Sequence, residues 1–226
     1  MLEVEVERPL ARAGAWYELF PRSWGGLAGT AEVIPALAEL GFDVEGDRCH
    51  LRGLDVVLTG LESGSGIHGW GWRGVEKPAV GDIPTLAADR EPTGTGAPHP
   101  NQAVGLFYVV LFGPSWAEAA EALAALGVDP GEPRPMGPEG KQVLRSVAPA
   151  GEVSVEVIGP AEHDPNREWN LWGTIVEVAD IDATASRLGD RLRAVKPAMQ
   201  KGRRIATLDK TAGSSVALAF MSPLES

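Results

Sequence analysis

The feature that most constrains this sequence is an order of segments that occurs twice in its C-terminal part. Each copy has an apolar strand, a helix, two strands joined by polar turns and a last apolar strand. Duplication is the simplest account of such self-similarity. The sequence therefore predicts an α+β fold built from tandem βαβββ modules.

The first copy begins with the β-branched and aromatic run 104–112 (VGLFYVVLF), which Gly113-Pro114 ends. A helix is predicted over 116–126, because Ser115 and Glu118 have the spacing of a capping box and Gly127 suits the C-terminal end. The apolar face of this helix must pack on a sheet. Two segments with alternating polar and apolar residues are typical of half-buried strands and complete the copy: 141–147 and 152–158.

The second copy opens with the predicted strand 172–178 (WGTIVEV). Its helix is predicted over 181–188, with Asp180 as the N-cap and Gly189 as the stop. Three strands separated by turn residues are predicted to follow: 191–197, 203–209 and 216–221.

A third, weaker copy of the same order of segments is predicted in the N-terminal region. It consists of the strand 15–20, a helix over 31–40 and the strands 48–52, 54–59 and 67–72. The segment between Val75 and Gln102 is rich in Pro, Gly and Thr, which is typical of a linker. The predicted organisation is therefore a degenerate βαβββ module at 1–75, a linker at 76–102 and a two-module domain at 103–226.

Charge and composition exclude several classes of partner. The formal net charge of -11 argues against nucleic acid, which is bound largely through Lys and Arg. The basic stretch 187–210 is interpreted as a solvated helix end and hairpin. No segment is apolar over the ~18 residues that a membrane span needs, so no membrane association is expected. The single cysteine, Cys49, excludes an internal disulfide, is expected to be an inert core thiol and fits a cytoplasmic protein.

From about His99 to Pro223 the sequence resembles the vicinal oxygen chelate superfamily, in its glyoxalase-like branch. The resemblance is carried by HPNQAVGLFYVVLF, GEVSVEVIGP, LWGTIVEVADIDATASRLGDRL and GRRIATLDKTAGSSVALAFMSP. It implies a bacterial-type protein whose paired modules form a curved mixed sheet around a cup. It also implies a small-molecule ligand in that cup, and in many members a divalent metal held by His, Gln or Glu from first and last strands.

A second, shorter resemblance lies at the N-terminus. Residues 13–44, with AGAWYELFPRSWGG and LAELGFDV, are similar to the start of the catalytic barrel in bacterial α-glucan maltosyltransferases. The rest of the chain is too short for a (β/α)₈ barrel, which needs about 250 residues. The similarity is therefore interpreted as a shared fragment without the activity.

The metal-binding pattern of the superfamily is incomplete here. Where metal-binding members carry a first-strand His, this chain has 107–109 (FYV), and the last strand of the second copy (VALAFM) has no ligand. Glu156 alone would leave a cation weakly held, because catalytic zinc usually has three protein ligands. The four histidines have no ligand spacing with one another, and His99 before Pro100 is interpreted as fixing the entry to a strand. No metal site and no cofactor are predicted.

The superfamily geometry implies which side chains face the cup. Arg203 or Arg204 would reach its rim. For Tyr108 and Trp172, core packing is the competing interpretation, and for Glu156 it is an exposed strand position. No catalytic residue is assigned, and the predicted ligand-binding residues are Tyr108, Gln142, Glu156, Trp172 and Arg203.

Three hypotheses follow. The first is a metal-independent glyoxalase-like protein that binds a small organic molecule in a cup at the module interface. The second is a metal-dependent lyase, isomerase or dioxygenase of the same superfamily. The third is an interaction protein whose modules pair across a homodimer, because an odd number of modules would leave a sheet edge exposed.

Overall fold

The computed structural model describes residues 3–4, 17–20, 37–58, 66–88, 92–212, 214 and 216–225. Of residues 3–4 and 17–20 it describes the backbone alone. Most strands in the described residues belong to one 12-stranded mixed sheet, and a separate 3-stranded sheet lies at the N-terminal side.

The first module starts with strand β8 (Ala103–Phe112), and helix α2 (Trp116–Ala125) follows it. The capping box predicted for this helix is present: the Ser115 hydroxyl accepts from Glu118 N–H at 3.1 Å and donates to its carboxylate at 2.7 Å. The module is completed by β9 (Arg134–Met136), β10 (Val143–Ala150) and β11 (Val153–Gly159). The strand order is β8-β11-β10-β9, with β8 and β11 parallel.

The second module repeats this order. It contains β12 (Asn170–Val178) and α3 (Ile181–Leu188), whose N-cap Asp180 accepts from the N–H groups of Asp182 and Ala183. The remaining elements are the 3₁₀ turns η2 (Gly189–Arg191) and η3 (Lys210–Ala212) and the strands β13 (Lys196–Pro197), β14 (Arg204–Thr207) and β15 (Ala217–Met221). Strand β15 runs parallel to β12 and is followed outward by β14 and β13.

The prediction of one strand over 191–197 is wrong. Arg191 lies in the turn η2, and its guanidinium donates to the carbonyl of Glu39 at 3.0 Å. Leu192 makes an isolated bridge with Leu208, and only Lys196 and Pro197 form a strand. Pro197 has no N–H to donate, which suits it to the edge of a sheet.

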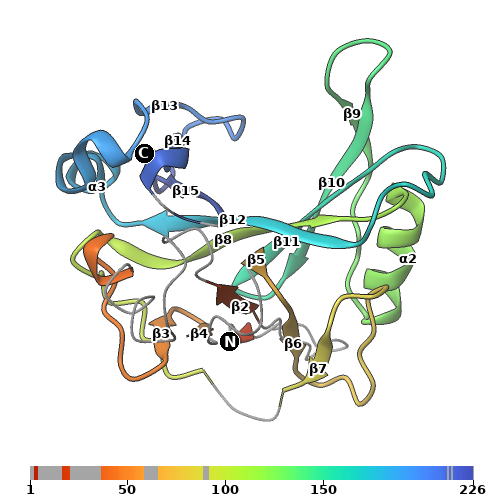
Figure 1. Ribbon diagram of the computed structural model, residues 1–226, viewed down its shortest axis with the longest axis horizontal. Coiled ribbons are helices and arrows are strands. Elements are labelled where there is room, and N and C mark those ends of the chain that lie inside the picture. The colour runs from red at the N-terminus through yellow and green to blue at the C-terminus, as the bar shows by residue number, and fades with distance from the viewer. Residues whose placement is uncertain are drawn as a thin grey trace.

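The two modules join through their first strands, since β8 and β12 pair antiparallel from Ala103↔Val178 to Phe112↔Asn170. Figure 1 shows the consequence: α2 and α3 flank the joined sheet, and the β9–β10 and β13–β14 strands rise on the same side of β8 and β12. The strand order therefore confirms the predicted fold class, an α+β chain of tandem βαβββ modules in one curved mixed sheet.

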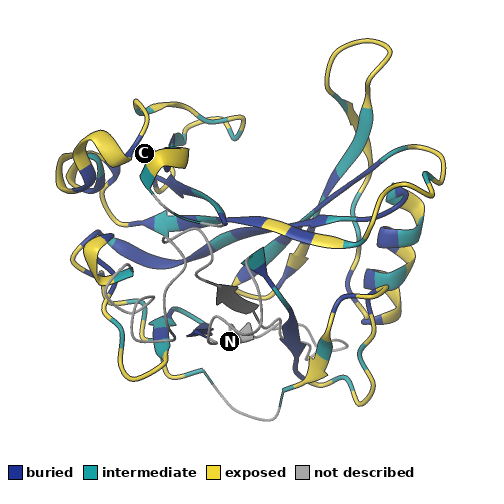
Figure 2. Cartoon of the chain, viewed as in Figure 1, coloured by how far each residue is buried: buried dark blue, intermediate teal, exposed yellow. Residues whose placement is uncertain are grey.

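Each strand of the first module has a helix face and an opposite face. Val109, Leu111, Val155 and Val157 are fully buried, and Trp116 of α2 donates from its indole to Ser146 on the same side. Side chains alternate along a strand. Tyr108, Glu156 and Arg145 therefore lie on the opposite face, which we call the cup face. Figure 2 shows the central strands as the buried middle of the molecule and the β9–β10 turn as exposed.

A β-bulge in β8 shapes the cup face near its middle. The pairing with β12 shifts between Ile175↔Tyr108 and Val176↔Leu106, which leaves Phe107 as the extra residue. The rings of Phe107 and Tyr108 consequently lie next to each other, with centroids 4.5 Å apart. A bulge re-aims side chains in this way.

The N-terminal region also contains strands of the predicted third copy. The described strands here are β1 (Glu3–Val4), β2 (Tyr17–Phe20), β3 (Arg48–Leu51), β4 (Leu54–Leu58), β5 (Gly66–Ile67) and β6 (Trp70–Trp72). Strand β2 pairs in parallel with β4, and β4 pairs antiparallel with β3, as β8, β11 and β10 do. Strands β3 and β4 thus take the places of the last two strands of a module, and the predicted last strand 67–72 lies outside this pattern.

The predicted strand 67–72 is divided between two sheets. Ile67 of β5 pairs with Leu19 of β2 and with Leu171 of β12. Strand β6 instead pairs with β1 and with β7 (Thr85–Ala87). Of the predicted helix 31–40, residues 37–39 are helical, and 31–36 lie outside the described residues. The division of the chain at 76 and 102 stays a prediction.

Buried polar residues attach the predicted linker to the modules. Asn101 is fully buried; its amide donates to the carbonyl of Leu40, and its side-chain oxygen accepts from Ala103 N–H.

Cys49 is buried in the core as predicted. Burial, with Asp43 and Asp55 nearby, raises the pKa of its thiol to about 12.

Candidate functional site

The cup face of the first module forms one wall of a cavity of about 320 Å³. The opposite wall is the loop that connects β13 to β14, which contributes Met199 and Gln200. The cavity therefore lies between the two modules. Its lining residues are Tyr108, Arg134, Pro135, Met136, Arg145, Met199 and Gln200.

Tyr108 links the floor of this cavity to its loop wall. The side chain is buried, and its hydroxyl accepts a hydrogen bond of 3.1 Å from the amide of Gln200. A buried tyrosine generally finds a partner for its hydroxyl. This contact holds the loop of the second module against the strand of the first.

Glu156 and Arg145 form an ion pair on the cup face. Their side chains are 13% and 17% exposed, and the guanidinium donates directly to the carboxylate. Glu156 thus has a strong cationic partner from the neighbouring strand. A charge-assisted bond of this kind satisfies a carboxylate that burial would otherwise penalise.

A second ion pair lies on the second module. Arg203 donates to Glu177 of β12 at 3.4 Å and to the carbonyl of Ser222 at 2.7 Å, and its guanidinium lies 4.4 Å from the ring centre of Phe107. Arg52 from the N-terminal region also donates to Glu177 and, at 3.0 Å, to Glu152. Arg52 therefore connects the N-terminal region to both modules.

The predicted ligand-binding residues are not all brought together. Tyr108 lines the cavity, and Glu156 approaches it through Arg145. Arg203 lies under Phe107, outside the lining. Gln142 is exposed just before β10. Trp172 is 54% exposed and stacks edge-on against Phe112 at the far end of β12, where it borders a different cavity of about 660 Å³.

Sequence reasoning missed six residues that line the cavity: Arg134, Pro135, Met136, Arg145, Met199 and Gln200. Arg145 had a signal, because the alternation of 141–147 against 152–158 indicates a hairpin in which it shares a face with Glu156. Arg134, Pro135 and Met136 form the short edge strand β9 of the same module. Met199 and Gln200 lie in a loop of the second module, so their approach to Tyr108 depends on how the two modules dock.

The residues on the cup face do not fit a divalent metal. Glu156 is bound to Arg145, and β15 (ALAFM) offers no ligand at the corresponding strand of the second module. Within the described parts of the chain, no three His, Cys, Asp or Glu side chains are grouped closely enough to hold an ion. We therefore derive no chemistry through a metal.

Comparison with known proteins gives limited similarity. No family model matches the chain. Among curated proteins, the α-1,4-glucan:maltose-1-phosphate maltosyltransferase of Mycobacterium tuberculosis is 50% identical over 52 residues, and that of Pseudomonas aeruginosa is 54% identical over 48 residues. Each alignment covers 18% of this chain and 7% of the relative. The chain thus matches only a small fraction of those enzymes.

Among solved structures, a methylmalonyl-CoA epimerase from Mycobacterium tuberculosis is 14% identical, with a TM-score of 0.43 over 54% of this chain and 89% of that chain. An epimerase from Streptomyces coelicolor is 15% identical, with a TM-score of 0.42 over 55% of this chain and 99% of that chain. The fold class follows from the strand order of the two modules.

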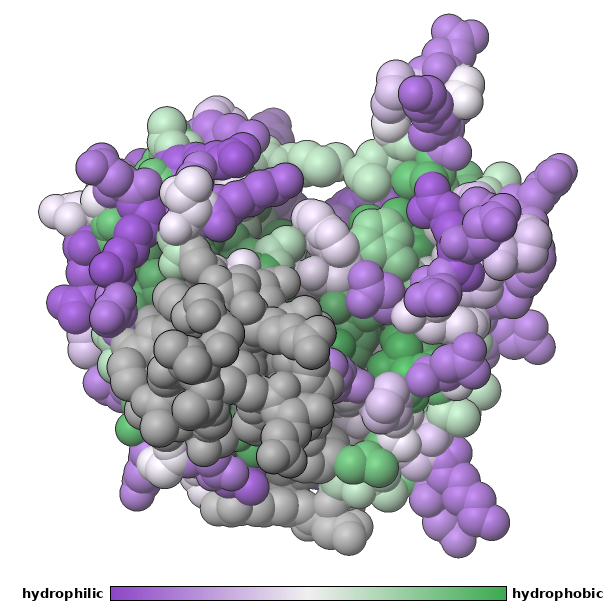
Figure 3. Space-filling view, in the orientation of Figure 1, coloured by the Kyte–Doolittle hydropathy of each residue, from purple (hydrophilic) through white to green (hydrophobic). Residues whose placement is uncertain are grey.

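No described helix is long and apolar enough to cross a membrane. Figure 3 shows that the arm formed by the β9–β10 turn, at the upper right, is strongly hydrophilic at its tip. The predictions of a cytoplasmic location and of a homodimer stay predictions.

Proposed function

We propose that this chain binds a small organic anion in the cavity between its modules, without a metal ion. The observation that carries the proposal is the set of groups around Tyr108: two guanidinium groups, an amide and two methionine side chains border one cavity, which is partly open to solvent. Ligand pockets commonly combine apolar walls with a few polar groups that fix orientation.

Arg134 supplies the charge for this binding. Unlike Arg145, it has no ion pair with any residue that the structure describes, and it is exposed at the edge strand β9. Its planar guanidinium has paired donors suited to a carboxylate or phosphate. A ligand anion would therefore bind Arg134 without first breaking an existing pair.

The methionines provide the apolar side of the site. Met136 and Met199 face the cavity from opposite modules, and Met199 is 77% exposed. Methionine adapts to irregular shapes because its side chain is unbranched and flexible. Covering Met199 with a ligand would also remove apolar surface from water, at about 25 cal/mol per Å².

The Arg145–Glu156 pair supports the metal-independent form of the proposal. A cation would have to displace the guanidinium from the carboxylate and leave Arg145 unpaired in a half-buried site. Breaking a buried pair in this way is costly. The anionic ligand instead leaves the pair intact.

The test is isothermal titration calorimetry of the full chain with a panel of small mono- and dicarboxylates, after metal ions have been removed from protein and buffer with a chelating resin. The proposal predicts saturable binding of at least one of them, at least tenfold weaker in Arg134→Gln and unchanged in Lys141→Gln. Lys141 is an exposed cation in the adjacent turn and serves as the matched control. Binding that requires an added divalent metal, or that is equal in wild type and Arg134→Gln, would overturn the proposal.

A further inference from the structure

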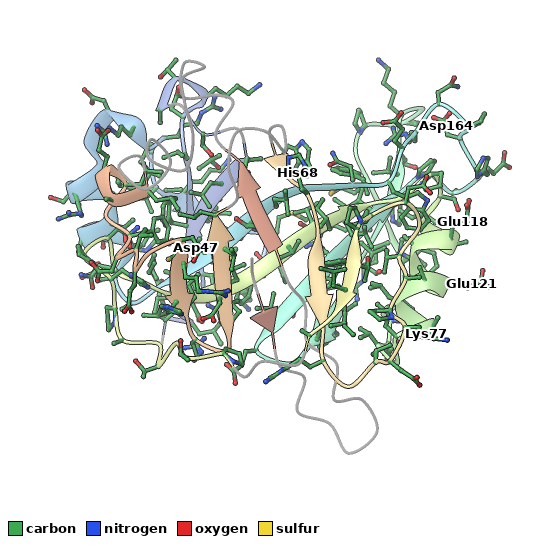
Figure 4. All side chains as sticks on the ribbon, turned by 60° about the horizontal axis from the view of Figure 1, so that its bottom comes forward. Asp47, His68, Lys77, Glu118, Glu121 and Asp164 are labelled. Atoms are coloured by element: carbon green, nitrogen blue, oxygen red, sulfur yellow. The ribbon has the colours of Figure 1, made fainter. Side chains whose placement is uncertain are left out.

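A third pocket lies at the N-terminal region, on a part of the molecule that the proposed function does not use. Its volume is about 360 Å³. Figure 4 marks this region by Asp47, near β3 and β4, well away from Glu118 and Glu121 on α2. The pocket is lined by Asp43, Glu45, His50, His99 and the loop Thr93–Pro98.

The central group of this pocket is a histidine oriented by a buried carboxylate. His50 on β3 and Asp55 on β4 are direct cross-strand partners, and Nδ1 of His50 lies 2.5 Å from Oδ1 of Asp55. Asp55 is fully buried, whereas the His50 side chain is 24% exposed. In the neutral imidazole this carboxylate favours the proton on Nδ1, as in other His–carboxylate pairs.

This tautomer leaves Nε2 of His50 with a free lone pair. No described residue makes a hydrogen bond to Nε2, since the contacts of this ring to Asp55 and to Thr93 Oγ1, at 2.9 Å, both involve Nδ1. The imidazole of His50 therefore presents Nε2 as an acceptor, while Asp55 holds the ring through Nδ1.

Both ring nitrogens of the second histidine, His99, form hydrogen bonds within the protein. Nδ1 of His99 accepts from the N–H of Asp43 at 3.0 Å, and Nε2 donates to the carbonyl of His50 at 2.9 Å. His99 is buried. It consequently forms a wall of the pocket and contributes no free donor.

The loop Thr93–Pro98 lies very close to β3. A Cβ on Gly94 would lie 1.8 Å from the carbonyl oxygen of Leu51, and one on Gly96 would lie 2.9 Å from Cβ of Arg52. Only glycine lets this backbone lie so close to β3. The loop is thereby positioned over the same strand that carries His50.

The groups left available in the pocket are mainly acceptors. Besides Nε2 of His50, the carboxylates of Asp43 and Glu45 line it without an ion pair to any described Lys or Arg. Neighbouring cations are engaged elsewhere: Arg48 lies 3.7 Å from Asp47 and 3.9 Å from Asp55, and Arg52 bonds Glu152 and Glu177. Behind His50 and outside the lining, Oδ2 of the buried Asp55 has no hydrogen-bond partner among the described residues.

From this geometry we infer that the pocket is a second ligand site, which binds a small organic ammonium ion. The ammonium N–H groups would donate to Nε2 of His50 and to the carboxylates of Asp43 and Glu45. An ammonium group carries three donors and no acceptor, which complements a pocket of acceptors with negative charge. An anion would meet no guanidinium or ammonium group in the lining.

The test is an NMR titration of the isotopically labelled full chain at constant pH. The imidazole signal of His50 is followed, after assignment with His50→Gln, during addition of ethylammonium chloride. Sodium chloride and sodium acetate at the same ionic strength are the controls. A saturable shift of the His50 signal is expected with ethylammonium alone.

Variants decide whether the named groups form the site. The Asp43→Asn/Glu45→Gln double variant changes exposed side chains and is expected to weaken ethylammonium binding at least fivefold. His163→Gln, which alters an exposed histidine beside Glu118, and Arg134→Gln in the cup are expected to leave it unchanged. A linear drift equal to that with sodium chloride, saturation with acetate, or unchanged binding in the double variant would overturn the inference.

Discussion

The two modules share one topology but differ on the face that lines the cup. On the helix side both are apolar: Val155 and Val157 are fully buried in the first module, and Phe220 and Val178 are fully buried in the second. On the cup side the first module has the pair Arg145–Glu156, whereas β15 of the second (ALAFM) is uncharged. The two modules are therefore alike on the helix face and differ on the cup face.

The largest effect is expected from the helix face of the second module. Phe220→Ala would remove a fully buried aromatic ring and is expected to lower the free energy of unfolding by about 3–5 kcal/mol. Ile175→Ala, on the half-buried opposite side of β12, is the comparison and should cost clearly less. Urea denaturation measures both; equal losses would show that the two faces do not differ in this way.

The next effect concerns the ion pair on the cup face. Glu156→Gln would leave Arg145 without its carboxylate and is expected to destabilise the chain by roughly 1–3 kcal/mol, reduced by partial exposure. The double variant Arg145→Met/Glu156→Leu should recover most of this loss, because no unpaired charge remains. If the single and double variants were equally unstable, the pair would not be the cause.

Smaller effects are expected at the helix N-termini, where the modules are alike. Ser115 caps α2 and Asp180 caps α3 through side-chain oxygens, so Ser115→Ala and Asp180→Ala should each cost about 1 kcal/mol. Thermal denaturation of the two variants is the measurement. A loss confined to one variant would indicate that only one module relies on its cap.

The smallest effect is the acid response of the α2 cap. Hydrogen bonds from His163 and Ser115 lower the pKa of Glu118 below its ordinary value of 4.5. A lowered carboxyl pKa gives stability that is present above the unfolded pKa and is lost as pH falls through the folded value. Glu118→Gln should therefore flatten the stability profile slightly below about pH 4.5, as measured by denaturation at stepwise lower pH. An unchanged profile would contradict this linkage.

Much of the fold could be predicted because local signals agree with it. The helix at 181–188, the cap at Ser115 and the long strand beginning at 104 each have a strong pattern of their own. The prediction of a strand over 191–197 was wrong because its first residue lies in the turn Gly189–Arg191 and contacts Glu39, a residue distant in sequence. Such a contact leaves no periodic signal.

The site was less predictable for the same reason. Tyr108 was identified from its strand, but Gln200 and Met199 reach it from a loop of the other module. The bulge at Phe107 also changes which side chains share the cup face. Registers and loop positions of this kind arise from packing between modules, which a single sequence does not specify.

The metal independence proposed for the cup follows from the Arg145–Glu156 pair, which occupies the carboxylate that a cation would need. Metal analysis of the purified full chain, after separate dialysis against Mn²⁺, Co²⁺, Ni²⁺ and Zn²⁺, tests it most directly. We predict clearly less than one equivalent of any metal per chain, with no change in Glu156→Gln. One tightly retained equivalent that disappears in Glu156→Gln would contradict the account.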